Sequence, residues 1–298
     1  MKNHMTRREF AALAGAAALA RPAFGQSGGE ALMRAIPSSG ERLPAVGLGT
    51  AQVFDSDDEA TRQKAKAVLQ ALSAGGGNLV DTASTYGNAE SVLGDAIAGT
   101  GLRPKLFIAT KAEAPDDAEF KRSLARLKTA KVDLVQLHNV DDPQQSLERF
   151  RDWKAQGLCR YIGITSTFHR DFAAVEAVLK RENPDFLEID YSLDNRLAEK
   201  SILPAAAEAK AAVLVALPFG RARLFRAVRG KEIPDWARGF ANSWAVFFLK
   251  YLLSDPRITV VIPGTNNPAH MTDNLGAMRG PLPDADQRRQ METFAAAL

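Results

Sequence analysis

The chain of 298 residues is 46% hydrophobic and 24% charged, which is ordinary for one large globular domain or two medium ones. Its net charge of +3 comes from the first 25 residues, and the balanced remainder has no basic stripe of the kind that binds nucleic acid. The single cysteine excludes an internal disulfide framework, the scattered histidines give no metal-ligand spacing, and no apolar run is long enough for a membrane span.

The first 25 residues have the pattern of an export signal. A basic start precedes a weakly apolar Ala/Leu stretch, and residues 23–25 (Ala-Phe-Gly) form a small-x-small cleavage site. Residues 6–10 (Thr-Arg-Arg-Glu-Phe) resemble the twin-arginine signal that the Tat export machinery reads. An ordinary amphipathic helix is the alternative, but the Ala/Leu stretch has almost no polar face. We therefore expect a signal peptide at 1–25, a periplasmic or otherwise exported location, and a folded domain at 26–298.

Short apolar runs alternate with amphipathic stretches along the rest of the chain. The runs are continuous, as is typical of parallel strands that are buried on both faces. They lie at residues 43–49, 78–82, 106–111, 132–138, 161–165, 186–190, 212–217 and 259–264. These positions predict eight strands.

The stretches between the runs predict helices. Asn88 is expected to cap a helix that begins near Ala89. Residues 116–131 start acidic and end basic, which suits the helix dipole. Pro143 and Gly157 bracket another stretch as a helix start and stop. Further helices are expected over 58–76 and 242–254.

The repeat of strand and helix indicates the fold class. About eight such units in about 270 residues is the period of an α/β (β/α)8 TIM barrel. A doubly wound sheet is the alternative, but it would normally carry a G-x-G-x-x-G motif after its first strand, and the chain has none. No interior linker or composition break divides the chain. We predict a single barrel.

Polar side chains gather where the expected strands end. Asp81 ends the second strand with Tyr86 in its loop, Lys111 ends the third, and His138 ends the fourth. Each alone is compatible with an ordinary capping, solvated or rim residue. In a barrel, however, these strand ends surround one mouth, where ligands bind. Because an unpaired charge there would be costly, we expect Asp81 and Lys111 to pair.

These four side chains suit the reduction of a carbonyl group. A carbonyl oxygen develops negative charge as the carbon takes up hydride, and it needs a proton. Tyr86 can supply that proton, because the ammonium of Lys111 is expected to lower the tyrosine pKa from its reference value near 10. Asp81 would hold the ammonium, and His138 would orient the carbonyl oxygen.

Motifs in this order resemble the aldo-keto reductase family, from about Leu43 to Asn274. The matching pieces are "VGLGT", "VDTASTYGNAES", "IATK", "QLHNV", "IGIT", "PDFLEIDYSL", "LPFGRARLF" and "VIPGTNNPAHMTDNLGA". An aspartate followed after four residues by Tyr-Gly is among the family's more specific motifs. The resemblance implies NAD(P)H-dependent reduction of aldehydes or ketones without a Rossmann domain. It implies a catalytic tetrad of Asp81, Tyr86, Lys111 and His138.

The resemblance also implies where the nicotinamide lies. The positions that bind its carboxamide correspond to Thr165, Ser166 and Glu188, where many members have Ser, Asn and Gln. An ionised glutamate only accepts hydrogen bonds, whereas glutamine both accepts and donates. Ala216 stands where many members place an aromatic ring against the nicotinamide.

The phosphate end of the implied cofactor site departs further from the family pattern. Gly264 and His270 stand where well-known members place Lys and Arg against the 2′-phosphate of NADPH. Arg221 and Arg223 are candidate replacements, with ordinary solvated loop charges as the alternative. We still expect NADP(H) rather than NAD(H). The other implied contacts are Pro218, Phe219, Gly220, Thr265 and Asn274.

Two other functions remain open for the same residues. Lys111 could be the nucleophile of a Schiff-base lyase. A non-catalytic barrel could bind the cofactor as a sensor or partner subunit, which the departures at Glu188 and Ala216 would allow. Retention of all four tetrad residues favours a reductase that acts on a small carbonyl substrate. We expect the loop at 221–237 to cover the substrate pocket.

Overall fold

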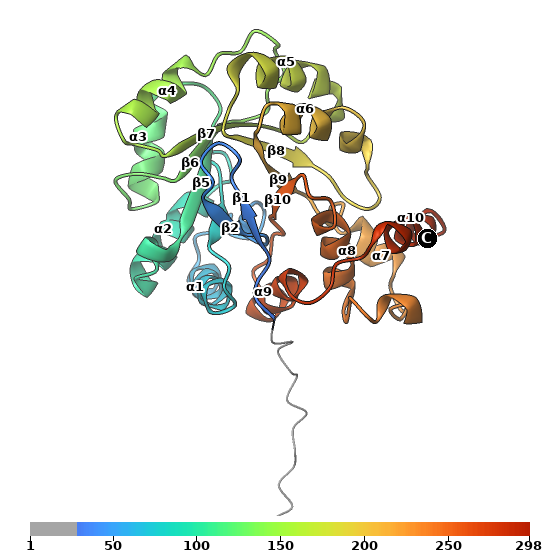
Figure 1. Ribbon diagram of the computed structural model, residues 1–298. Helices are drawn as coiled ribbons and strands as arrows, with labels where there is room; N and C mark the ends of the chain where they lie inside the picture. Colours follow the sequence, from blue (N-terminus) through green and yellow to red (C-terminus); the bar gives the residue numbers. More distant parts are fainter. Residues whose placement is uncertain (1–28) are drawn as a thin grey trace, which may run out of the picture.

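Eight parallel strands follow one another around a barrel in the order of the chain (Figure 1). The computed structural model describes residues 29–298, so the expected export signal lies outside the described residues. The barrel strands are β3 Leu48–Gly49, β4 Leu79–Asp81, β5 Phe107–Ala112, β6 Leu134–Leu137, β7 Tyr161–Ser166, β8 Phe186–Asp190, β9 Ala212–Ala216 and β10 Ile258–Val261. The prediction of a (β/α)8 barrel is confirmed.

The expected first strand at 43–49 is wrong as a single element. Leu43 and Pro44 pair antiparallel with Arg34 and Met33, whereas β3 pairs parallel with β4 in the barrel. Between these two parts, Gly47 donates to the carbonyl oxygen of Val261 in β10 at 2.9 Å. Isolated parallel bridges, one of them from Gly49 to Gly264, then join the first and last strands. The barrel therefore closes through its shortest strand.

A hairpin that the sequence did not predict covers the end of the barrel where the strands begin. It consists of β1 Met33–Ala35 and β2 Arg42–Pro44, which pair antiparallel and lie across the barrel centre in Figure 1. Ile36 and Leu43 of this hairpin join inward side chains such as Phe107 in one buried cluster. The hairpin leaves the carboxyl-terminal ends of the strands as the open end.

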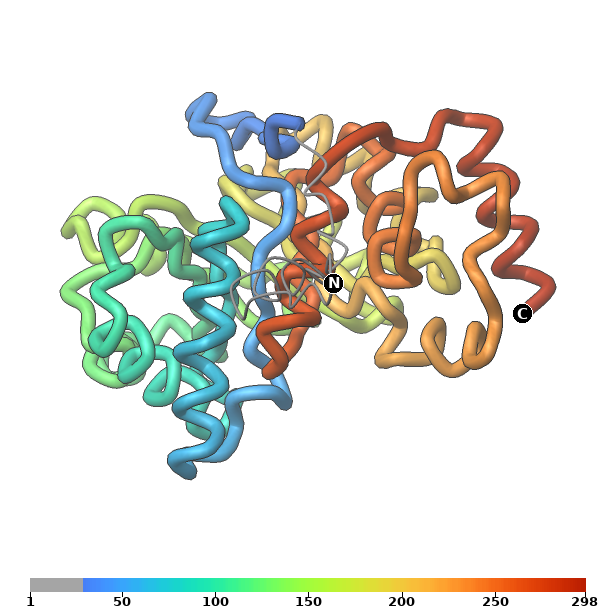
Figure 2. The backbone as a smooth tube through the Cα atoms, turned by 90° about the horizontal axis from the view of Figure 1, so that it is seen from below, coloured from blue at the N-terminus to red at the C-terminus, as the bar shows by residue number. Residues whose placement is uncertain are grey.

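The helices surround the barrel, with α2–α4 on one side and α7, α8 and α10 on the other (Figure 2). The α-helices are α1 Glu59–Ala74, α2 Ala89–Thr100, α3 Asp117–Arg126, α4 Glu148–Ala155, α5 Phe172–Glu182, α6 Ile202–Glu208, α7 Arg223–Ala227, α8 Trp244–Leu253, α9 Pro268–Leu275 and α10 Ala285–Ala296. Short 3₁₀ turns are η1 Arg103–Lys105, η2 His169–Asp171, η3 Leu197–Glu199, η4 Asp235–Ala237 and η5 Gly276–Met278. Among residues 29–298, no helix is long and apolar enough to cross a bilayer.

Two expected helix starts differ in detail. Pro143 does not begin a helix, because it lies in a turn that the Asp142 side chain caps, and α4 starts only at Glu148. The helix α2 does begin at Ala89, but Asn88 makes no capping bond. Its amide instead donates to the carbonyl oxygen of Asp55 at 3.1 Å, which ties together two loops at the open end of the barrel.

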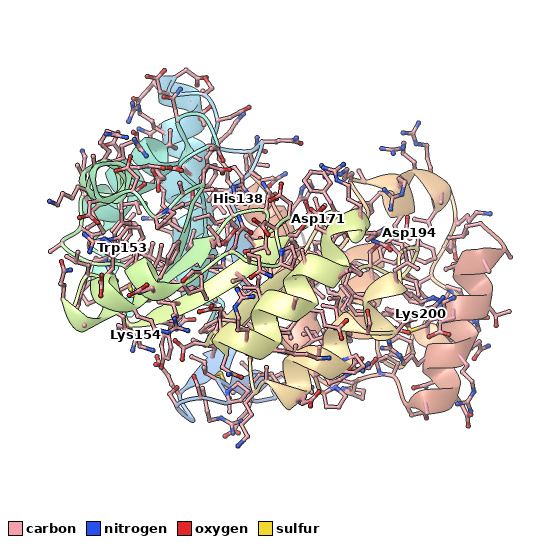
Figure 3. All side chains as sticks on the ribbon, turned by 90° about the horizontal axis from the view of Figure 1, so that it is seen from above. His138, Trp153, Lys154, Asp171, Asp194 and Lys200 are labelled. Atoms are coloured by element: carbon pink, nitrogen blue, oxygen red, sulfur yellow. The ribbon has the colours of Figure 1, made fainter. Side chains whose placement is uncertain are left out.

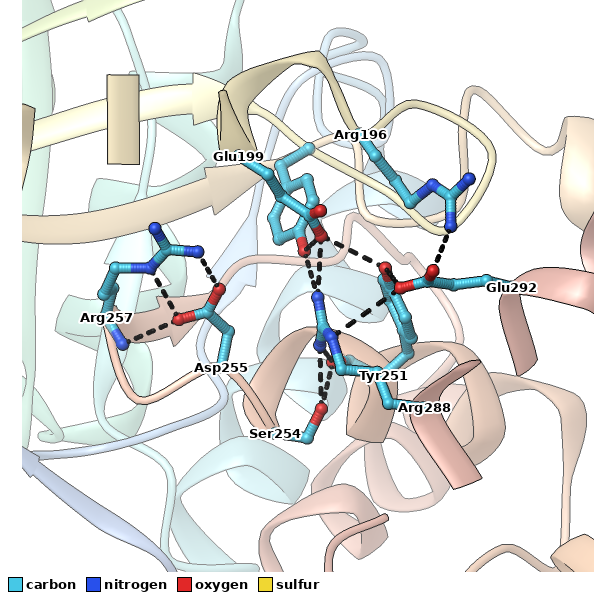
Figure 4. Close-up of polar contacts among 9 residues, drawn as sticks. Arg196, Glu199, Tyr251, Ser254, Asp255, Arg257, Arg288 and Glu292 are labelled. Atoms are coloured by element: carbon cyan, nitrogen blue, oxygen red, sulfur yellow. Dashed lines mark hydrogen bonds and ion pairs between the residues drawn. The ribbon is translucent and has the colours of Figure 1, made fainter. Parts of the chain in front are cut away.

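The last helix is fastened to the outside of the barrel by a polar network (Figure 4). Arg288 of α10 donates to the hydroxyl of Tyr191 and to the carboxylate of Glu199, each at 2.7 Å. Its guanidinium lies 3.9 Å from the ring centroid of Tyr251, whose hydroxyl donates to Glu292 at 2.8 Å. None of these residues lines the cavity at the mouth of the barrel, so we infer that the network stabilises the fold and takes no part in ligand binding.

Candidate active site

A cavity of about 810 Å³ opens at the carboxyl-terminal ends of the barrel strands. Its walls come from the ends of β3, β4 and β6–β10 and from the loops that follow them. The volume is in the range of pockets that hold small ligands and cofactors. Of the expected tetrad, Asp81, Tyr86 and His138 line this cavity, and Lys111 lies directly behind it. The prediction that these strand ends share one mouth is confirmed.

The expected pairing of Asp81 and Lys111 is also confirmed. Phe107 and Ala109 of β5 point into the barrel, and the two-residue period of the strand sends Lys111 the same way. Its Nζ donates to Asp81 Oδ2 at 2.5 Å and to the carbonyl oxygen of Thr82 at 3.1 Å. Both side chains of the pair are buried, so Lys111 has one fixed position.

Glu188 is a second carboxylate on the same ammonium. Its Oε2 lies 3.2 Å from Lys111 Nζ and accepts a hydrogen bond of 2.7 Å from Gln136. Gln136 also donates to Asp81 Oδ1 at 3.4 Å, so one amide links the two carboxylates. Gln136 was not predicted as a site residue, although a glutamine inside the apolar strand β6 is a sign of an inward polar contact.

The charges in this cluster fix its protonation. Burial favours the neutral amine, but the charges of Asp81 and Glu188 outweigh it and raise the pKa of Lys111 above its usual value. Burial and the charge of Glu188 raise the pKa of Asp81, although Lys111 opposes them. Lys111 therefore remains an ammonium without a free lone pair, which argues against a role as a Schiff-base nucleophile.

Tyr86 lies half-buried above this cluster. Lys111 Nζ is 5.1 Å from the centroid of its ring, and the ring of His138 meets it edge-on with centroids 5.8 Å apart. Burial raises the pKa of Tyr86 to about 12, against the lowering effect of Lys111. The expected fall in this pKa is therefore wrong for the protein without bound cofactor, because burial outweighs the ammonium. The phenol stays protonated at neutral pH.

His138 follows the last residue of β6, and one of its ring nitrogens is already in contact with a carboxylate. Nδ1 contacts Oε1 of Glu113, and the hydroxyl of Thr85 lies 3.4 Å from the same nitrogen. Burial and the charge of Lys111 lower the pKa of His138 below its usual value, while Glu113 opposes them. Glu113 was not predicted; it follows the end of β5 in a bend and is partly exposed.

The residues expected to bind cofactor divide into two groups. Those that line the cavity are Thr165, Glu188, Pro218, Phe219, Arg221 and Gly264. Those that do not are Ser166, Gly220, Arg223, Thr265, His270 and Asn274. His270 is exposed on α9, whereas Asn274 is buried in the same helix. The cavity thus includes Thr165 and Glu188 of the three expected carboxamide positions, and only part of the expected phosphate positions.

Two of the side chains that do not line the cavity are instead bonded to carboxylates of neighbouring loops. The Ser166 hydroxyl donates to Asp171 at 2.9 Å, and Arg223 pairs with Asp194 at 2.9 Å; both carboxylates are labelled in Figure 3. Gly220 has a φ of 56°, and a Cβ there would lie 2.6 Å from Asp194 Oδ1. These residues shape the loops after β7 and β9 and leave Arg221 as the arginine on the cavity wall. In the described part of the chain, acidic, histidine and cysteine side chains form no group able to hold a metal ion.

Comparison with known proteins adds an independent line of evidence. Residues 45–293 match the model of the aldo/keto reductase family. The uncharacterized oxidoreductase YqkF of Bacillus subtilis is 26% identical, with 89% of this chain and 94% of that protein covered. The methylglyoxal reductase YeaE of Escherichia coli is 27% identical, with 82% and 88% covered.

A solved structure agrees with these sequence relatives. An aldo/keto reductase from Klebsiella pneumoniae in complex with NADP and acetate superposes with a TM-score of 0.72 at 25% identity, over 86% of this chain and 92% of that one. Since the family model spans nearly all the described residues, the chain belongs to the aldo/keto reductase family of oxidoreductases.

Proposed function

We propose that this protein reduces an aldehyde or ketone to the alcohol with NADPH, and that Tyr86 donates the proton. The observation that carries this proposal is the convergence of four groups on one cavity. A protonated phenol, a buried ammonium, its carboxylate partners and an imidazole all lie at the mouth of the barrel. A non-catalytic sensor would have no use for a proton donor held in this way.

The cavity has suitable groups for a nicotinamide. Both contacts of Glu188 with the cluster involve Oε2, which leaves Oε1 to accept the amide N–H of a carboxamide. The hydroxyl of Thr165, opposite Glu188 in the register of β7 and β8, can donate to the carboxamide oxygen. When bound, the cofactor supplies the hydride.

The side chains of the chain supply the rest of the reaction. The substrate oxygen binds between Tyr86 and His138, and the hydrogen bond from the phenol stabilises the charge that develops there. The Tyr86 proton passes to this oxygen, since an alkoxide is a stronger base than a phenolate. Lys111 then stabilises the phenolate electrostatically, and Asp81 holds Lys111 in position. Solvent returns the proton to Tyr86 before the next turnover.

The proposal of NADPH rests on Arg221 and on family members. The Klebsiella pneumoniae structure contains NADP, and Arg221 lines the cavity beside Phe219. We expect NADPH to bind more tightly than NADH in a fluorescence titration of the purified protein. Arg221→Ala should weaken NADPH binding by about tenfold or more, the value of a charged phosphate contact of roughly 1.5–3 kcal/mol.

Arg229→Ala is the matched control, since Arg229 is an exposed arginine of the same segment that does not line the cavity. A tenfold preference for NADH, or equal effects of the two substitutions, would contradict the cofactor proposal.

The substrate class can be tested with the same purified protein, by following the oxidation of NADPH in the presence of a panel of aldehydes and ketones. The panel should include methylglyoxal, because the relative YeaE is named for its reduction.

We also propose export through the twin-arginine route. The support is the sequence of residues 6–10 and 23–25, together with the need of a nicotinamide-dependent enzyme to load cofactor before it leaves the cytoplasm. Bound cofactor also stabilises the folded state, by about 2.7 kcal/mol at a hundredfold excess over Kd. Cys159 is the chain's one cysteine, so folding needs no oxidising compartment.

Cell fractionation with an activity assay tests this route. The wild-type protein should be exported with its start near Gln26, and Arg7→Lys with Arg8→Lys should hold the folded, active enzyme in the cytoplasm. Wild-type protein found in the cytoplasm with residues 1–25 intact would refute export and leave the catalytic proposal untouched.

A further inference from the structure

A carboxylate outside the expected tetrad contacts the histidine of the site. Glu113 Oε1 contacts His138 Nδ1 and also accepts a hydrogen bond of 3.1 Å from the Thr85 hydroxyl. Since a carboxylate can only accept, the hydrogen in the first contact belongs to the imidazole. The geometry therefore places the ring proton on Nδ1. In residues 29–298, Nε2 of this ring has no hydrogen-bond partner, and His138 lines the cavity.

Charges from several elements face this ring. Lys111 of β5 disfavours the imidazolium, while Glu113 and Glu188 favour it, and burial disfavours it further. The phenol of Tyr86 packs against the ring from the loop after β4. The balance lowers the pKa of His138, with burial as the largest cause and Lys111 next. At neutral pH the ring is therefore mostly neutral.

We propose that Glu113 is a positioning residue that holds the proton of neutral His138 on Nδ1. Nε2 then meets a ligand oxygen as an acceptor while the ring is neutral, and as a donor only after the ring takes up a second proton. Without Glu113, a neutral ring could place its proton on Nε2 and donate to a carbonyl oxygen directly. The choice between the two tautomers is thus made by the partner of the opposite nitrogen.

This inference, where it concerns catalysis, rests on the proposed reductase function. Donation to a substrate carbonyl would need the imidazolium, so kcat/KM for reduction should fall as pH rises through the His138 titration, below about pH 6.5. Oxidation of the alcohol product would instead use neutral Nε2 as an acceptor and should rise over the same window. Glu113 would therefore set how the rates of reduction and of oxidation each depend on pH in this window.

The decisive test observes the ring itself, independently of activity. Long-range proton–nitrogen NMR spectra, with His138 assigned by the loss of its signals in His138→Asn, distinguish a proton on Nδ1 from one on Nε2. We expect Nδ1–H in the neutral wild-type ring. In Glu113→Ala, Nε2–H should become the main neutral form and the pKa of His138 should fall, because a negative neighbour is lost.

Glu119→Ala is the matched control, since Glu119 accepts from Ser84 at 2.6 Å and has no contact with the imidazole. It should leave the tautomer unchanged. Glu113 is 42% exposed, so its truncation opens no cavity. An Nε2–H tautomer in the wild type, or the same tautomer in wild type and Glu113→Ala, would overturn the proposal. If reduction is measurable, its fall with pH should also disappear in Glu113→Ala. A protein that reduces nothing would fail the proposed function and leave the tautomer result to stand alone.

Discussion

Replacing Tyr86 by phenylalanine is expected to lower kcat for carbonyl reduction by about 10²–10⁴-fold, the contribution typical of a general acid. The substitution removes only the hydroxyl. The ring keeps its contacts with His138 and Lys111, so the variant should fold and bind cofactor like the wild type. Steady-state kinetics with saturating NADPH, together with a cofactor titration, would separate a chemical defect from a binding defect.

Tyr161→Phe is the control for loss of a tyrosine hydroxyl. The Tyr161 hydroxyl donates to Glu41 Oε2 at 2.6 Å and lies 2.8 Å from the Ser39 hydroxyl, and the ring belongs to the inner cluster plugged by the β1–β2 hairpin. The Tyr161→Phe substitution should lower the free energy of unfolding by about 1 kcal/mol and leave kcat unchanged. A Tyr86→Phe enzyme with near wild-type kcat would show that another group donates the proton.

Replacing Lys111 by methionine is expected to have the largest effect on folding. It removes the one ammonium between Asp81 and Glu188, both buried, and leaves two carboxylates facing each other. Breaking a buried ion pair in this way costs about 3–5 kcal/mol. Urea unfolding would measure the loss, and carbonyl reduction should fall with it because the phenolate of Tyr86 loses its stabilising charge.

A second variant separates charge from packing. Lys111→Met combined with Asp81→Asn and Glu188→Gln removes the repelling carboxylates, so it should recover much of the lost stability without recovering activity. Lys180→Met is the surface control, since its ion pair with Glu176 is exposed and should contribute little to stability. Equal unfolding free energies for Lys111→Met and wild type would contradict the ion-pair assignment.

The strands were predictable because each is a short continuous apolar run, as is typical of parallel strands buried on both faces. The exception is the run at 43–49, whose first residues pair with β1 in the hairpin while its last residues pair with β4 in the barrel. Sequence periodicity does not say with which neighbour a backbone group will pair. The hairpin at residues 33–44 escaped prediction because its strands, of three residues each, are too short to show a periodic pattern.

The candidate site was predictable where chemistry and strand ends coincide. Asp81 and Lys111 pair as expected because adjacent strand ends bring them together. Glu113 and Gln136 were missed. Nothing in the sequence marks the loop residue Glu113 as a partner of His138, and the available sign for Gln136 was its polar side chain inside an apolar strand. The pKa of Tyr86 was predicted in the wrong direction because the sequence shows the nearby Lys111 but not the burial that outweighs it.

Transfer of deuterium is the most direct test of carbonyl reduction by this protein. The purified wild type is mixed with NADPH deuterated at C4 on one face or the other, and the alcohol formed from each carbonyl of the panel is analysed by mass spectrometry. We predict that one of the two labelled cofactors delivers a single deuterium to the product, at least 100-fold more slowly in Tyr86→Phe. A folded protein that binds NADPH yet yields no labelled alcohol from any aldehyde or ketone would contradict the reductase function and favour a non-catalytic role.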